Sequence, residues 1–207
     1  MKRIVFATNN ADKAREIRKI LKDIDAEVYV LKDLGIHSDP EENGETFAEN
    51  ARIKALDVYR QLKEAGNLSQ TVVMADDSGL CIDYLEGKPG VQSARFLGHD
   101  TSYVLKNAAI LKALEEVPEE KRGAQFVCHI CAINEDGRIF DAESEMCGRI
   151  ARESKGKQGF GYDPIFYLPE FGCTSGELSE EEKNRISHRG KVLRKIREIL
   201  CRNGILS

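Results

Sequence analysis

Two adjacent carboxylates, Asp76 and Asp77, follow an apolar run that has the character of a buried strand. The stretch reads VVMADDSGL from residue 72 to residue 80, so we expect the strand to end at the carboxylates and a glycine turn to follow. Two like charges at the end of a buried strand cost desolvation and mutual repulsion, unless a cation or a hydrogen-bonding substrate compensates them. An ordinary turn explains one carboxylate and leaves the other without a role. The pair therefore indicates a site for something positively charged.

A second polar stretch, from Thr8 to Lys13, joins the first apolar run to an amphipathic segment with Ala14, Ile17 and Leu21 on one side. Such a strand-to-helix turn offers free backbone amides to an anion, and open α/β sheets bind ligands at the carboxyl ends of their strands. The sequence lacks the Walker A pattern, GxxxxGK[ST]. The alternative is an asparagine-rich helix cap with a surface lysine.

The acidic segment PEENGE, residues 40–45, lies just before a helix start and places Glu41 and Glu42 beside a glycine. On the helix that follows, Asn50 and Lys54 are four residues apart and share a face next to this loop. Magnesium takes one or two carboxylates plus phosphate oxygens, and lysines neutralise the remaining phosphate charge. These residue types therefore suit a magnesium-bound polyphosphate.

Two late stretches add further polar and aromatic side chains. GKQGFGYDPIF, residues 156–166, surrounds Phe160 and Tyr162 with glycines, which suits stacking of a nucleobase; the alternative is a turn whose aromatic rings belong to the core. SHRGK, residues 187–191, places His188 and Arg189 in the first turn of the last helix behind Ser187. Basic residues there oppose the helix dipole, so a ligand explains them better than local structure does.

The elements that must position these residues can be read from hydrophobic periodicity. Apolar runs predict strands over residues 3–7, 27–31, 71–75, 124–133, 138–148 and 164–168. Capping boxes predict helix starts at Thr46 and Ser179. An apolar side with Val192, Leu193 and Ile196 predicts the last helix. A further helix has an apolar stripe from Leu105 to Leu114 and is expected to end at Pro118. Early alternation of strands and helices with long adjacent strands in the middle predicts an α/β domain with a mixed sheet.

Composition narrows the class of protein further. The 207 residues contain 41% hydrophobic residues and carry a net charge of -4 with both signs well mixed, which fits one sizeable domain and gives no electrostatic footprint for nucleic acid. The sequence contains neither an apolar run of membrane-spanning length nor a signal peptide, so we expect a cytoplasmic protein. Cys128 and Cys131 are expected on opposite faces of one strand, which excludes a shared metal, and His129 between them is interpreted as structural. The six cysteines are expected to be reduced and mostly buried.

Taken together, these motifs resemble the inosine triphosphate pyrophosphatase family, whose members hydrolyse non-standard purine nucleoside triphosphates to the monophosphate and pyrophosphate. The resemblance covers nearly the whole chain. It runs, in the family's order and spacing, through TNNADKAREI, ENGETFAENARIKA, ADDSGLCIDYLEGKPGVQSARF, GFGYDPIF and EEKNRISHRGKVL.

The resemblance implies a role for each matching position. The triphosphate would be bound by Thr8, Asn9, Asn10 and Lys13, with Lys54 and Ser78 nearby. Glu42 and Asp77 would ligate Mg2+, Asp77 would accept a proton from the attacking water, and Asp76 would support the metal or its waters. The base pocket would be lined by Phe160, Gly161, Tyr162 and Asp163, the nucleotide would be contacted by Lys183, and the purine edge would be read by His188 and Arg189. The implied fold is a single nucleoside-triphosphate pyrophosphatase domain over residues 1–207, with an elongated mixed β-sheet, flanking helices and two lobes around a central nucleotide-binding cleft. A homodimer is implied as well.

Several alternatives remain at this stage. Gly176 stands where alanine is expected in TSGELS, and Glu41 competes with Glu42 as the metal ligand. A related pyrophosphatase for other modified nucleotides would carry the same phosphate machinery. A non-catalytic nucleotide-binding module would not require Glu42, Asp76 and Asp77 beside Lys13 and Lys54.

Overall fold

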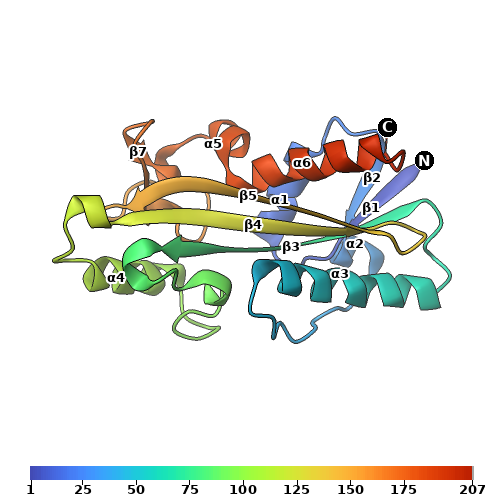
Figure 1. Ribbon diagram of the computed structural model, residues 1–207, viewed down its shortest axis with the longest axis horizontal. Coiled ribbons are helices and arrows are strands. Elements are labelled where there is room, and N and C mark those ends of the chain that lie inside the picture. Colours follow the sequence, from blue (N-terminus) through green and yellow to red (C-terminus); the bar gives the residue numbers. More distant parts are fainter. Residues whose placement is uncertain (207) are drawn as a thin grey trace. The chain divides into compact units, whose positions relative to one another are not determined.

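The computed structural model describes residues 1–206, and Figure 1 shows their helices and strands. The strands are β1 (Lys2–Phe6), β2 (Ala26–Val30), β3 (Thr71–Ile82), β4 (Gly123–Ile133), β5 (Ile139–Ile150), β6 (Phe166–Leu168) and β7 (Cys173–Thr174). The α-helices are α1 (Ala11–Ile20), α2 (Leu31–Leu34), α3 (Phe47–Glu64), α4 (Tyr103–Ala113), α5 (Glu180–Ile186) and α6 (His188–Arg202).

The strands form one mixed sheet in the order β2-β1-β3-β4-β5-β6-β7. Strand β1 pairs in parallel with both β2 and β3, whereas β6 pairs antiparallel with both β5 and β7. The predicted α/β class with a mixed sheet and flanking helices is therefore confirmed.

The described chain divides into two compact units, and β3, β4 and β5 each contribute to both. Unit 1 comprises residues 1–77, 128–144 and 189–207, and unit 2 comprises residues 78–127 and 145–188. In unit 1, α1 and α6 cover one face of the sheet and α3 covers the other (Figure 1), and each face has its own apolar cluster. Unit 2 has a separate cluster around Leu80, Ile110 and Phe166. The single domain over residues 1–207 with two lobes stays a prediction.

Most elements match the sequence prediction, because their signals are local. The capping box at Thr46 and Glu49 opens α3, and a second box at Ser179 and Glu182 opens α5. Strand β7 was not predicted, because two residues give no periodic pattern.

Two predictions about elements were wrong. Strand β3 does not end at Ala75 but continues to Ile82, so the DDSG segment lies inside a strand and is not a turn. Helix α4 ends at Ala113, well before Pro118, and it buries a different face: Leu105 is 60% exposed, while Lys106 and Asn107 are buried. Both polar side chains have partners, since Lys106 Nζ donates to the carbonyl of Ala94 and Asn107 Nδ2 to that of Gly161.

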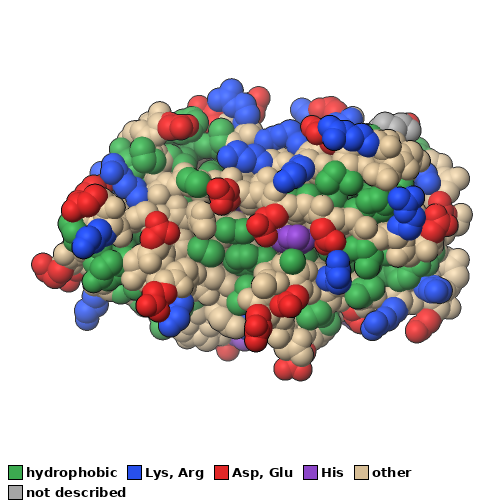
Figure 2. Space-filling model, in the orientation of Figure 1, with side chains coloured by type: hydrophobic (Ala, Val, Ile, Leu, Met, Phe, Trp, Pro, Cys, Tyr) green, Lys and Arg blue, Asp and Glu red, His purple; other side chains and the backbone are tan. Residues whose placement is uncertain are grey.

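The expectation of free thiols is confirmed, but the expectation that most cysteines are buried is wrong, because Cys81, Cys173 and Cys201 are half-buried and only two of the six are buried. All six cysteines are free thiols; Cys128 and Cys131 are buried in different apolar clusters on opposite faces of the sheet, while Cys147 is exposed. His129 lies between Asp141 and Glu143, with ring nitrogens 3.1 and 3.4 Å from their carboxylate oxygens, which fits a structural role. Figure 2 shows acidic and basic side chains interspersed over the visible face. Within residues 1–206, none of the helices has the length and apolar character of a membrane span.

Candidate active site

The turn between β1 and α1 is built as a helix cap. Asn10 is the N-cap of α1, and its side-chain oxygen accepts hydrogen bonds from the amides of Asp12 and Lys13. Thr8 Oγ1 accepts from the amide of Asn10 at 3.1 Å, and Asn9 Nδ2 donates to the carbonyl of Ser38 at 2.9 Å. The helix cap is therefore confirmed, but Lys13 is not a surface lysine, because its side chain is only 17% exposed and pairs with Asp76. Phosphate binding by this turn stays a prediction.

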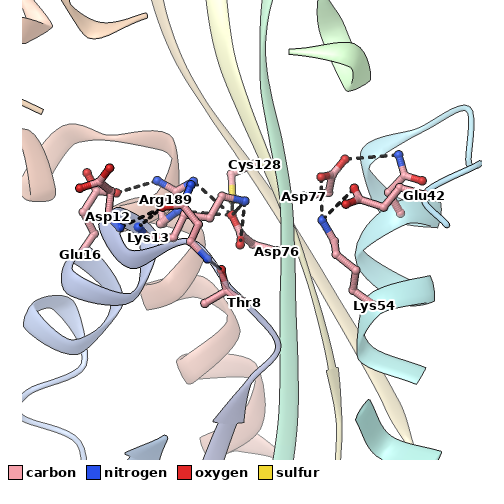
Figure 3. Close-up of polar contacts among 12 residues, drawn as sticks. Thr8, Asp12, Lys13, Glu16, Glu42, Lys54, Asp76, Asp77, Cys128 and Arg189 are labelled. Carbon is pink, nitrogen blue, oxygen red and sulfur yellow. Dashed lines mark hydrogen bonds and ion pairs between the residues drawn. The ribbon is translucent and has the colours of Figure 1, made fainter. Parts of the chain in front are cut away.

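Lys13 points from α1 to Asp76 on β3, with its Nζ atom 3.0 Å from a carboxylate oxygen. Arg189 of α6 donates to the same carboxylate through Nε at 3.3 Å and Nη2 at 3.2 Å, and its Nη1 lies 2.6 Å from Glu16. Cys128 Sγ is 3.7 Å from Asp76 (Figure 3). We call Lys13, Glu16, Asp76, Cys128 and Arg189 the Asp76 cluster.

Asp77 interacts with a different set of side chains. Lys54 of α3 lies 2.8 Å from Asp77 Oδ1 and 3.1 Å from Glu42 Oε2, so one ammonium group bridges the two carboxylates. Asn50, one turn earlier on α3, places its Nδ2 atom 3.4 Å from Asp77 Oδ2. We call Glu42, Asn50, Lys54 and Asp77 the Asp77 cluster.

The two carboxylates lie on opposite sides of β3, as Figure 3 shows. Successive side chains of a strand alternate between the faces of its sheet, so Asp76 points toward α1 and α6 and Asp77 toward α3. The expectation of two carboxylates compensated at one place is thereby corrected: each has its own lysine. The role of Asp76 in supporting the metal stays a prediction, and its contacts in the structure are to Lys13, Arg189 and Cys128.

The pKa values of the two carboxyl groups shift in opposite directions. Burial alone would raise the pKa of Asp76, but the charges of Lys13, Arg189 and Lys54 hold it well below its ordinary value. Burial and the negative charge of Glu42 raise the pKa of Asp77. The charges of Lys54 and Lys13 lower this pKa but do not fully offset the rise. Burial works to lower the pKa of Lys54, yet Asp77, Asp76 and Glu42 together raise it. Asp76 therefore stays ionised to lower pH than Asp77 in the metal-free chain.

The Asp77 cluster fits a magnesium ion that is shared with a substrate. Glu42 and Asp77 already converge on one positive charge, the ammonium group of Lys54. Within residues 1–206 no group of three or more His, Cys, Asp or Glu side chains is placed to hold a metal. Magnesium at a phosphate-transfer site needs only one or two carboxylates, because substrate oxygens and water complete its shell.

In unit 2, the Asp163 carboxylate binds several groups of the glycine-rich turn and the segments around it. Its carboxylate accepts hydrogen bonds from the amide of Phe160 at 2.8 Å, Ser175 Oγ at 2.9 Å and Lys183 Nζ at 2.7 Å. Lys183 also lies over the Phe160 ring, 4.9 Å from its centroid. A Cβ atom at Gly159 would come within 2.2 Å of the Asp163 carboxylate, which explains the glycine there. Asp163 thus fixes Phe160 and Lys183 relative to each other.

The remaining predicted residues of unit 2 differ in exposure. Tyr162 is buried in the apolar cluster, packs edge-on against Tyr103 and donates its hydroxyl to the carbonyl of Ser93 at 2.7 Å, so its ring belongs to the core and not to a stacking surface. Phe160 is only partly buried. Gly161 has a φ of 71° and its carbonyl accepts from Asn107. His188 stacks on Phe126 with ring centroids 4.9 Å apart, and Ser78 directly follows Asp77 on β3.

Sequence reasoning missed three polar residues that hold these groups. Glu16 pairs with Arg189, Ser175 binds Asp163, and Asn107 binds the Gly161 carbonyl. Glu16 lies three residues after Lys13 on the buried side of α1, which is a weak signal without knowledge of its partner. Ser175 and Asn107 carry no local signal.

The fold and these side chains define a class: a mixed α/β protein in which lysine–carboxylate clusters lie on both faces of strand β3. The chain belongs to the Ham1 family, whose model matches residues 4–199. The chain is 43% identical over 206 residues to a dITP/XTP pyrophosphatase of Clostridium perfringens, with both chains fully covered. It is 46% identical to a dITP/XTP pyrophosphatase of Geobacillus kaustophilus, with 96% of this chain and 94% of that protein covered.

Solved structures give the same assignment. A HAM1 protein from Coxiella burnetii superposes with a TM-score of 0.83 at 38% identity, covering 98% of this chain and all of that one. The Ham1 protein of Staphylococcus aureus gives a TM-score of 0.82 at 36% identity, with coverages of 96% and 98%. The family resemblance drawn from the sequence is confirmed.

Proposed function

We propose that this chain is a nucleoside-triphosphate pyrophosphatase that hydrolyses dITP, ITP and XTP to the monophosphate and pyrophosphate, and so cleanses the nucleotide pool. The observation that carries the proposal is the Asp77 cluster: a buried carboxylate held beside Lys54 and Glu42, in a chain of the Ham1 family. The family relatives named dITP/XTP pyrophosphatase support this choice of substrate.

Asp77 is the proposed proton acceptor. A water oxygen forms a bond to the α-phosphorus, the bond between that phosphorus and the bridging oxygen to the β-phosphate breaks, and pyrophosphate leaves. One proton of the water passes to an oxygen of Asp77, a buried carboxylate that lies 2.8 Å from Lys54. Glu42 and Asp77 would hold Mg2+, which when bound neutralises charge on the phosphate oxygens.

The remaining residues are proposed to bind the nucleotide. Lys13 and Lys54 supply positive charge to the triphosphate, and both are already held in place by carboxylates. The other proposed contacts are Thr8, Asn9, Asn10 and Ser78 to phosphate, and Phe160, Gly161, Asp163, Lys183, His188 and Arg189 toward the base. Arg189 would have to exchange part of its pairing with Asp76 and Glu16 to read a purine edge.

A homodimer and a cytoplasmic location complete the proposal. The homodimer rests on the family resemblance alone. The six free thiols support a reducing compartment.

A substrate panel tests the reaction directly. Purified chain is incubated with dITP, ITP, XTP, dGTP and ATP at fixed Mg2+, and phosphate is measured by malachite green with and without added inorganic pyrophosphatase. We expect colour from dITP, ITP and XTP only when inorganic pyrophosphatase is present. Colour without that enzyme would mean stepwise release of phosphate, and it would overturn the proposed position of the attacking water.

A further inference from the structure

Asn50 is a fully buried polar side chain at the point where the acidic loop before α3 meets β3. Its exposed fraction is 0%, although asparagine is a residue usually found at the surface. A buried amide is costly unless its hydrogen bonds are satisfied, so the partners of Asn50 indicate what its burial achieves.

Those partners belong to the two segments that carry the proposed metal ligands. Asn50 Oδ1 accepts from the amide of Gly44 at 2.9 Å, and Nδ2 lies 3.4 Å from both the Gly44 carbonyl and Asp77 Oδ2. Gly44 is two residues after Glu42 in the same loop. One side chain therefore connects the loop of Glu42 to the carboxylate of Asp77.

Gly44 is fitted to this contact from the loop side. A Cβ atom at Gly44 would stand 2.6 Å from Glu49 Cβ and 2.8 Å from Asn50 Oδ1. The φ of Gly44 is not in the left-handed region, so backbone conformation does not require glycine there. The requirement is the close approach of the loop to α3 at Asn50.

We infer that Asn50 is a positioning residue that sets the separation of Glu42 and Asp77, and through it the affinity for the divalent cation. The inference rests on the proposed function, because it concerns the same cation. Loss of a side chain that orients a metal ligand typically lowers metal affinity about 10- to 100-fold. Lys54 alone does not replace Asn50, because a lysine ammonium on a flexible stem follows whichever position the two carboxylates take.

Asn50→Ala and Gly44→Ala break this connection from its two sides. For both variants we expect the Mg2+ concentration for half-maximal pyrophosphate release from dITP to rise about 10-fold or more. At saturating Mg2+, kcat should stay within about threefold of the unaltered chain, because Asp77 itself is retained. The matched control is Val58→Ala, a buried position on the same helix in the apolar cluster, which should lower Tm and leave the Mg2+ dependence unchanged.

A second readout uses the metal-free chain and needs no activity. Hydrogen exchange at the Gly44 amide should become faster in Asn50→Ala, which has lost the acceptor, and remain unchanged in Val58→Ala. An unchanged Mg2+ dependence in both Asn50→Ala and Gly44→Ala, or a fall in kcat that Mg2+ does not restore, would overturn the inference. If the unaltered chain releases pyrophosphate without Mg2+, the proposed function fails at the metal, and the exchange rates still decide whether Asn50 holds the loop.

Discussion

The Asp76 cluster and the Asp77 cluster contain consecutive residues of one strand, yet they shift the pKa of their buried carboxylates in opposite directions. Asp76 receives Lys13 and a forked pair of hydrogen bonds from Arg189, and its pKa is lowered. Asp77 has direct contact with one ammonium group, which it shares with Glu42, and its pKa is raised. Burial pushes both values upward, so the difference comes from the number of cations on each face of β3.

In the proposed function, this difference would separate a mainly structural carboxylate, Asp76, from a reactive one, Asp77. A carboxylate with two cationic partners stays ionised and fixes the side chains around it, as Asp76 fixes Lys13 between α1 and β3. An under-compensated carboxylate is poised to bind a further cation or a proton. Adjacent positions in a strand can take such different roles because the sheet places them on opposite faces.

The largest expected effect is on catalysis by Asp77→Asn. Loss of a general base typically costs about 100- to 10,000-fold, and we expect kcat/KM for dITP to fall within that range. Stability should be preserved or slightly increased in metal-free buffer near neutral pH, because the ionised form of Asp77 is disfavoured in the folded state. Steady-state kinetics and thermal unfolding measure the two effects. Near-normal turnover, or a large fall in Tm, would remove the distinction between the clusters.

Asp76→Asn should mainly lower the stability of the fold, in contrast to Asp77→Asn, which should mainly lower catalysis. Removing one partner of a buried charge network leaves the others uncompensated and typically costs about 3–5 kcal/mol. For a chain of this length each kcal/mol corresponds to roughly 2–4 °C in Tm. Urea unfolding of metal-free Asp76→Asn beside Asp77→Asn provides the test, and we expect the Asp76 variant to be the less stable. If the order is reversed, the pairing of Asp76 with Lys13 and Arg189 contributes less than its burial suggests.

The pH dependence of stability should separate the same two groups. The pKa of Asp76 is lowered below its ordinary value of 3.8, so its contribution is present above that value and is lost as pH falls through the folded-state pKa. The pKa of Asp77 is raised above 3.8, so stability declines as pH rises from 3.8 through the folded-state pKa. Unfolding free energies at several pH values should show a shallower acid loss in Asp76→Asn and no such decline in Asp77→Asn. Parallel curves for both variants would contradict the opposite shifts.

Much of the fold could be predicted, because its signals are local. The capping box of Thr46 and Glu49 and the apolar stripe after it specify α3 without any tertiary information. The end of β3 could not be predicted in this way, because Asp, Ser and Gly favour a turn locally. The strand continues through Asp76 and Asp77, where cationic side chains from α1, α3 and α6 compensate the two carboxylates. These contacts come from residues far away in the sequence.

Some members of the two clusters were expected from the sequence, but their arrangement was not. Lys13 and Lys54 stand out because charged residues beside strand ends and helix caps are recognisable in a sequence, whereas Glu42 was preferred to Glu41 only through the family resemblance. The separation of Asp76 from Asp77 by the faces of β3 required knowing that both lie inside the strand. Glu16 could not be assigned, because its partner Arg189 is 173 residues away.

The smallest expected effect concerns the second carboxylate of the Asp76 cluster. Glu16→Gln keeps the shape and a hydrogen-bond acceptor for Arg189 Nη1 and removes the charge. Hydrogen bonds to charged groups contribute about 1 kcal/mol more than neutral ones, so we expect a comparable loss of stability, with kcat for dITP within about threefold of the unaltered chain. Glu198→Gln is the matched control, because Glu198 pairs with Arg202 at 3.6 Å on the exposed side of α6, where ion pairs contribute little. Urea unfolding of both variants measures the difference. Equal stability in the two variants would mean that Asp76 alone neutralises Arg189. The Asp76 cluster would then differ from the Asp77 cluster in its additional cation, and the charge of Glu16 would not contribute to folding.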